Sequence, residues 1–97
     1  MKNPDRKLFV IEENGNLIGS IRADYSEDVC ELSWSIDKDS RGRGVAKQMV
    51  AKIMNQINKP VCAEIKNWNI PSIHIAKYVG MKLKHENNGI LYYGTNN

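Results

Sequence analysis

A short glycine-rich and basic stretch, Ser40 to Lys47, constrains the fold more than any other part of the sequence. It follows a run of strong strand preference ending at Ile36, and it leads into apolar residues that recur at helical spacing. Such a junction leaves backbone N–H groups unpaired at a helix N-terminus, where the macrodipole favours anions. No acidic residue occurs between Arg41 and Pro60, although helix starts usually carry one. The stretch therefore predicts a phosphate site.

Known phosphate motifs narrow this prediction. A Walker loop requires Gly-Lys-Ser/Thr, which the stretch lacks, and the dinucleotide fingerprint requires a small residue where Lys47 stands. The pattern R-x-x-G-x-A fits, with Arg41, Gly44 and Ala46. On these residues alone, a basic helix start facing solvent is an equally good explanation. The rest of the chain must decide between the two.

The hydrophobic pattern predicts one domain over residues 1–97, in which strands and helices alternate in the second half. Asn-Gly dipeptides at Asn14 and Asn88 are typical hairpin turns. The strand before the glycine-rich turn and the strand after the first helix should be parallel neighbours, because a helix connects them. The predicted strands cover 7–12, 17–23, 29–36, 61–65, 81–86 and 90–93, and the predicted helices cover 45–58 and 72–79.

Charge and composition exclude several classes. The net charge of +3 is too small to indicate nucleic acid, and no stretch is apolar over the length of a membrane span. The two cysteines and the lack of a signal peptide predict a reduced, cytoplasmic protein. We expect Cys30 and Cys62 to be buried, unpaired thiols on neighbouring parallel strands. Neither His74 nor His85 has metal-ligand spacing with a cysteine, so no metal site is predicted.

Two segments together resemble the GNAT superfamily of acyl-CoA-dependent N-acyltransferases. The first is the strand Glu31 to Ile36 with the R-x-x-G-x-A turn, which is similar to ribosomal-protein N-terminal and amino-sugar acetyltransferases. The second is Asn69 to Met81, with Ser72 and a closing Gly-Met. The resemblance implies an α+β (α/β) fold with a mixed central sheet in the order β-β-β-α-β-α-β-β. It also implies that the chain lacks the family's first strand and two helices.

The resemblance implies acetyl-CoA as cosubstrate, without a metal. The glycine-rich turn would hold the pyrophosphate, and the end of the third strand would offer backbone groups to the pantetheine arm. Asn69 would contact that arm or fix its own loop. The residues implied in cofactor binding are Trp34, Ser35, Ile36, Arg41, Gly42, Arg43, Gly44, Val45, Ala46 and Asn69.

Two residues are candidates for catalysis. Glu31 would act as base towards the amine, directly or through water, although a strand carboxylate paired with a lysine is the commoner use of such a residue. Ser72 would donate to the leaving sulfur, but a serine just after a helix-start proline is equally a capping residue. Many family members carry a tyrosine where this chain has Ala76, and Tyr78 should point elsewhere because it is rotated around the helix. Trp68 could contact a ligand or pack over the core.

The function implied is transfer of an acetyl group from acetyl-CoA to a primary amine by direct attack. The acceptor is open between a peptide N-terminus, a lysine, a polyamine and an amino sugar, and a homodimer is also open. The alternative is a non-catalytic acyl-CoA-binding module, or a fragment that needs a partner for its acceptor site. A basic nucleic-acid-binding module ranks last, because no binding motif or interleaved aromatic residues accompany the charge.

Overall fold

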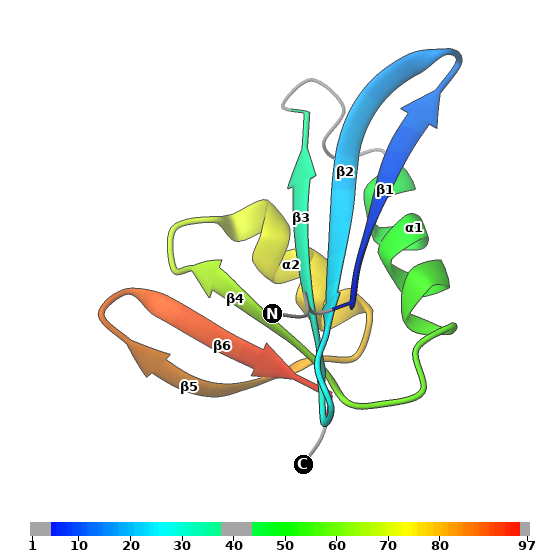
Figure 1. The fold of residues 1–97 in the computed structure, drawn as a ribbon. Coiled ribbons are helices and arrows are strands. Elements are labelled where there is room, and N and C mark those ends of the chain that lie inside the picture. Colours follow the sequence, from blue (N-terminus) through cyan, green and yellow to red (C-terminus); the bar gives the residue numbers. More distant parts are fainter. Residues whose placement is uncertain (1–4, 38–43, 96–97) are drawn as a thin grey trace.

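The computed structural model describes residues 5–37 and 44–95, which form a six-stranded sheet and two helices (Figure 1). The strands lie in the order β1-β2-β3-β4-β6-β5. The order of elements along the chain is the one predicted from the sequence. The elements are β1 Asp5–Glu13, β2 Asn16–Tyr25, β3 Cys30–Ile36, α1 Val45–Met54, β4 Val61–Lys66, α2 Ile70–Tyr78, β5 Lys82–Asn87 and β6 Ile90–Gly94.

Two Asn-Gly turns build the antiparallel hairpins at either side of the sheet. Asn14 and Gly15 both adopt positive φ angles, 53° and 82°, between β1 and β2. Asn88 and Gly89 have the same pair of angles, 53° and 82°, between β5 and β6. Two consecutive residues of positive φ make the turn whose twist matches a hairpin, and Asn-Gly tolerates it best. Both predicted turns are confirmed.

A parallel connection joins the two halves of the sheet. β3 and β4 are parallel neighbours with α1 between them in the chain, as the helix-containing connection predicts. β4 then pairs antiparallel with β6. The sheet is therefore mixed, and its one parallel junction among the described strands lies at its centre.

The two helices end close to their expected positions, with one difference. α1 ends at Met54, before the predicted end at Asn58, because Gln56 and Ile57 donate to carbonyls only three residues back and tighten the last turn. α2 ends at Tyr78, and Gly80 follows with φ of 94°. The Met81 N–H there donates to the Ala76 carbonyl at 2.9 Å, which satisfies an orphan acceptor at the helix end.

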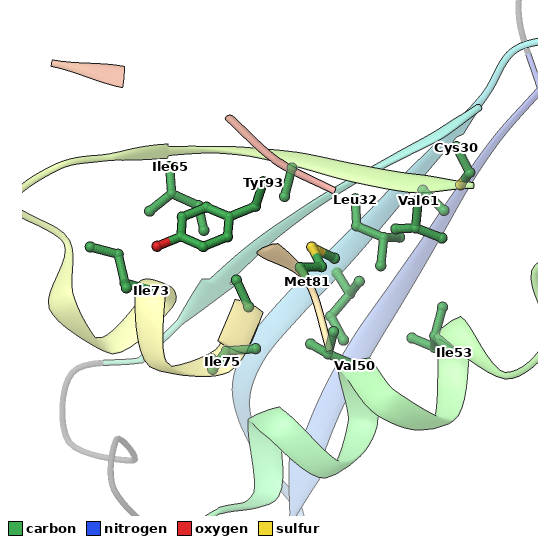
Figure 2. Packing of buried hydrophobic residues seen from close by; sticks show 14 of the residues in the cluster. Cys30, Leu32, Val50, Ile53, Val61, Ile65, Ile73, Ile75, Met81 and Tyr93 are labelled. Atoms are coloured by element: carbon green, nitrogen blue, oxygen red, sulfur yellow. The ribbon is translucent and has the colours of Figure 1, made fainter. Parts of the chain in front are cut away.

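Both helices pack on one face of the sheet. Figure 2 shows Val50 and Ile53 of α1, and Ile73 and Ile75 of α2, directed towards strand side chains such as Leu32. We call this side of the sheet the core face and the opposite side the open face. On the open face the exposed large side chains include Leu8 and Val10 of β1. Neither described helix is long and apolar enough to cross a bilayer.

The two cysteines belong to different faces of the central strands. Both are unpaired thiols, as predicted, and they lie near the starts of β3 and β4. Cys30 is fully buried on the core face, whereas Cys62 is only half-buried on the open face. The prediction that both are buried is therefore wrong for Cys62, because side chains alternate along a strand and neither described helix covers the open face.

Candidate functional site

The N-terminus of α1 offers unpaired backbone donors. Gly44 is the N-cap residue, with φ of 81° and ψ of −6°, and no side chain within residues 5–37 and 44–95 caps the helix. The first turn also contains no acidic residue. The first N–H groups of an α-helix have no intrahelical partner, so those of Val45 and Ala46 are available to an anion. Arg41, Gly42 and Arg43 lie outside the described residues, and their roles stay predictions.

A cleft of about 540 Å³ lies beside this helix start, between the end of β3, α1 and α2. It brings together most of the described residues that the sequence implicated in cofactor binding. Val45 is the exception, because its side chain does not line the cleft. The predicted residues that line it are Trp34, Ser35, Ile36, Gly44, Ala46, Asn69 and Ser72, and further lining residues are Lys47, Ile70, Pro71, His74, Ile75 and Tyr78.

The cleft continues to a gap in the sheet. β3 and β4 pair only at their starts, Cys30 with Val61 and Glu31 with Cys62, and then diverge (Figure 1). A second cavity of about 120 Å³ occupies this gap. Its lining includes buried core-face residues of both strands together with Ser33, Glu64 and Lys66 from the open face. The gap therefore connects the two faces of the sheet.

Three residues line both cavities and so lie where they meet: Trp34, Asn69 and Ser72. Asn69 is the N-cap of α2, and its side-chain oxygen accepts from the Ser72 N–H at 3.3 Å. This bond uses the backbone of Ser72 and leaves its hydroxyl for other partners. The capping and ligand-binding explanations of Asn69 are thus compatible, because its amide NH₂ group is not part of the cap.

The indole of Trp34 adds an observation that the sequence did not provide. Its Nε1 atom is buried and has no hydrogen-bond partner among the described residues. A buried donor without a partner costs about 1–3 kcal/mol, so such atoms in native proteins usually have an explanation. An acceptor on a ligand in the adjoining cleft would remove that cost.

Tyr78 lies differently from its prediction. Ala76 is fully buried in the core, and Tyr78 is indeed rotated away from it. Tyr78 nevertheless lines the cleft, because it follows His74 and Ile75 at helical spacing on the same side of α2. Its ring packs against Lys47 of α1, with the ammonium nitrogen 4.5 Å from the ring centroid. The expectation that Tyr78 points elsewhere is therefore wrong.

Two glutamates lie near the gap on the open face. Glu31 pairs in register with Cys62 and lines neither cavity, whereas Glu64 lines the gap. Burial raises the pKa of the Glu31 carboxyl, and the charges of Glu64 and Asp24 raise it further. Glu64 was not predicted from the sequence, although side-chain alternation along β4 places it on the same face as Glu31 of the neighbouring strand.

Other polar candidates lie further from the cavities. Asp24 binds Arg6 and Arg22 on the open face, and the hydrogen bond from Arg6 leads the lowering of its pKa. Trp68 is 71% exposed, so the expectation that it packs over the core is wrong. No cluster of His, Cys, Asp and Glu suited to a metal ion occurs within residues 5–37 and 44–95.

A comparison with known families identifies the family of this chain. Residues 1–82 match the model of an acetyltransferase (GNAT) domain. The chain belongs to the GNAT acetyltransferase family. No curated protein matches this GNAT domain in sequence.

Solved structures share the fold at low sequence identity. A domain from Methanocaldococcus jannaschii matches with a TM-score of 0.80 and 21% identity, over 92% of this chain and 65% of its own. RimL, a ribosomal L7/L12 alpha-N-protein acetyltransferase in complex with coenzyme A, gives 0.79 and 16% over 92% and 60%. The Campylobacter jejuni N-acetyltransferase PseH, in complex with acetyl coenzyme A, gives 0.74 and 16% over 92% and 66%. This GNAT domain thus spans less than two thirds of each of these chains.

Proposed function

We propose that this GNAT domain transfers an acetyl group from acetyl-CoA to a primary amine by direct attack. The observation that carries the proposal is the continuous path from the uncapped N-terminus of α1 to the gap between β3 and β4. That path joins a helix N-terminus without a side-chain cap among the described residues, a lined cleft and an opening to the opposite face of the sheet. A cosubstrate with a charged diphosphate at one end and a reactive thioester at the other matches this sequence of environments.

The diphosphate would bind at the start of α1. The N–H groups of Val45 and Ala46 would donate to phosphate oxygens, and Lys47 would supply a positive charge beside them. Arg41 and Arg43 would add side-chain clamps, since guanidinium groups bind phosphate bidentately. Gly42 and Gly44 would let the backbone approach the ligand closely, because they carry no Cβ.

The pantetheine arm would lie along the end of β3. Ser35 and Ile36 would offer backbone groups to its amides, while the buried Trp34 Nε1 would donate to one of its carbonyl oxygens. The Asn69 amide would donate from the opposite wall. The contact to Trp34 would satisfy a buried donor that the described residues leave without a partner, so binding would remove a cost already present in the fold.

The thioester would then reach the gap between β3 and β4. The amine nitrogen attacks the carbonyl carbon from the open face, and a glutamate accepts the proton that the amine loses. The tetrahedral intermediate collapses with cleavage of the C–S bond, and the thiolate takes a proton. Glu31 is the base predicted from the sequence, and the position of Glu64 on the gap makes it a second candidate. Ser72, which lines both cavities, would donate to the sulfur.

The acceptor would be a cationic amine before it loses its proton. Glu31 and Glu64 lie on the open face beside the gap, and their charges favour an ammonium group there. A peptide N-terminus, a lysine, a polyamine and an amino sugar all meet this requirement.

Binding of acetyl-CoA without transfer is the second candidate function. The observation that favours it is Ala76, which is buried where many family members carry a tyrosine near the sulfur. Loss of a proton donor costs about 10²–10⁴-fold in rate, so a chain without one could retain only the binding step.

Release of free CoA thiol separates the two functions. The assay would supply acetyl-CoA with each of four amines: a peptide with a free N-terminus, N-acetyl-lysine, spermidine and an amino sugar. Thiol release that depends on one amine, with the acetylated amine detected by mass spectrometry, supports transfer. Binding of acetyl-CoA by calorimetry with no product from any amine supports the binding module. Comparison of Glu31→Gln with Glu64→Gln then identifies the base. The variant that lacks the base should lose turnover, and this loss should diminish at high pH, where the amine loses its proton without help.

A further inference from the structure

Lys47 of α1 and Tyr78 of α2 meet across the large cleft. Lys47 is the third residue of α1 and Tyr78 is the last residue of α2, and both line the cleft. The ammonium nitrogen of Lys47 lies 4.5 Å from the centroid of the Tyr78 ring, within the range of a cation–π contact. This contact joins the two helices at the end of the cleft where α1 begins.

The charge of Lys47 is not explained by its own helix. A cation in the first turn of a helix is disfavoured by the macrodipole. No ion pair between Lys47 and a carboxylate is found within residues 5–37 and 44–95. The side chain leans towards the helix start, since a Cβ added at Gly44 would lie 3.6 Å from the Lys47 Cε atom. The Tyr78 ring therefore stabilises a charge beside the N-cap that is available to an anion.

Two other uses of Tyr78 fit its position less well. A role in the core conflicts with its exposure, because 55% of its surface reaches solvent. A role at the thioester conflicts with its place in the cleft, because Tyr78 does not line the second cavity in the gap, whereas Ser72 lines both cavities. Tyr78 follows Ser72 by six residues on α2, which is about 9 Å along the helix axis. Tyr78 therefore lies at the diphosphate end of the proposed path.

We propose that Tyr78 is a positioning residue for Lys47, and that it acts through the face of its ring and not through its hydroxyl. The inference rests on the proposed function, in which Lys47 lies beside the diphosphate of acetyl-CoA. The ring covers one side of the ammonium group, and the side away from the ring keeps N–H donors for phosphate oxygens. The cation–π contact is therefore kept when the diphosphate binds.

Positioning of Lys47 raises affinity by removing a cost of binding. An unrestrained lysine side chain has many rotamers, and it loses this freedom when its ammonium group binds a phosphate. When the ring already holds the ammonium group in place, part of this loss occurs on folding instead. Replacement of the ring by an aliphatic side chain should therefore lower the affinity for CoA about 3- to 10-fold, which corresponds to part of the side-chain entropy of a lysine.

Calorimetric titration of the whole chain with CoA tests the proposal. Tyr78→Leu should weaken binding, whereas Tyr78→Phe, which keeps the ring, should bind CoA as the wild-type chain does. In a chain that also carries Lys47→Met, Tyr78→Leu should change the affinity by less than about twofold, because the ring then has no ammonium group to hold. Tyr25→Leu is the matched control and should bind CoA normally. The Tyr25 ring also contacts lysines, with the Nζ atoms of Lys7 and Lys59 at 5.6 and 5.9 Å from its centroid, but it does not line the cleft.

The possible results separate this inference from the proposed function. An equal loss for Tyr78→Leu with and without Lys47 would mean that Tyr78 contacts the ligand itself, and would overturn the proposal. Tighter binding by Tyr78→Leu would overturn it as well, because the ring would then compete with the phosphate for the ammonium group. Either result leaves the CoA site of the proposed function intact. A wild-type chain that binds neither CoA nor inorganic pyrophosphate would refute the anion site and this inference together.

Nuclear magnetic resonance of the ligand-free chain tests the contact itself. Protons above the face of an aromatic ring resonate upfield, so the Cε protons of Lys47 should be shifted upfield in the wild-type chain and in Tyr78→Phe, but not in Tyr78→Leu. Lys52 is the internal reference, because it lies on the same helix and has no ring contact among the described residues. Lys47 resonances equal to those of Lys52 in the wild-type chain would refute the positioning role, whether or not CoA binds.

Discussion

Substitution of Gly44 should separate the strain of the helix start from its affinity for an anion. Gly44 has φ of 81°, and a Cβ added there would come no closer than 3.6 Å to Lys47 Cε. The cost of Gly44→Ala is therefore backbone strain without a clash, about 1–2 kcal/mol. For a domain of this size, each kcal/mol lowers the melting temperature by about 4–8 °C.

Gly44→Glu adds a charge to that strain. A carboxylate about 5 Å from a phosphate charge costs roughly 1–3 kcal/mol at effective dielectric constants between those of water and the protein surface, or about 5- to 150-fold in affinity. Calorimetric titration with CoA should therefore show a smaller loss of affinity for Gly44→Asn, whose side chain tolerates positive φ but adds a Cβ, than the loss of about 5- to 150-fold expected for Gly44→Glu.

Gly80→Glu is the control, because Gly80 has φ of 94°, no atom within 4 Å of an added Cβ and no part in the cleft. It should destabilise the fold to a similar degree while CoA binds normally. Equal affinities of Gly44→Glu and Gly80→Glu for CoA would refute the anion site at α1.

Tyr78→Phe should leave turnover nearly intact because the ring over Lys47 is kept, whereas Ser72→Ala should lower turnover by up to about 10²–10⁴-fold. Steady-state rates measure both effects, and the reverse result would contradict the roles given to these two residues. The raised pKa of Glu31 means that ionisation of its carboxyl costs stability as pH rises through that pKa, so Glu31→Gln should increase the free energy of unfolding at pH 7 by less than about 1 kcal/mol. No gain is expected below about pH 4, where the carboxyl is protonated in both the folded and the unfolded chain. A stability difference that stays the same across this pH range would exclude the explanation. A thiol reagent should label Cys62 before Cys30, which is fully buried, and both slowly because burial raises their pKa values; faster labelling of Cys30 under native conditions would contradict the packing.

The local elements of the fold could be predicted from the sequence because each depends on a few neighbouring residues. Asn-Gly dipeptides favour the positive φ angles of the two hairpin turns, and Asn69 with Pro71 marks the start of α2. The end of α1 was less predictable. The apolar spacing continues to Ile57, but the chain tightens after Met54 before it reaches Pro60.

The candidate site was only partly predictable, because it depends on how distant elements pack. The turn before α1 has a motif, and so does the start of α2. The roles of Tyr78 and Glu64 depend on where α2 sits against α1 and on how far β3 and β4 diverge, which no local pattern specifies. The unpaired Trp34 Nε1 is likewise visible only after its surroundings are known.

The divergence of β3 and β4 gives this sheet four edges instead of two. Beyond Glu31 and Cys62, the backbone amides that face the gap have no ladder partner in the described structure, although they lie in the middle of the sheet. Amide hydrogens there should exchange with solvent far faster than those between β2 and β3, which stay paired along the whole of β3. A molecule that fills the gap would protect these central amides, so hydrogen exchange could follow its occupancy without any chemical reaction.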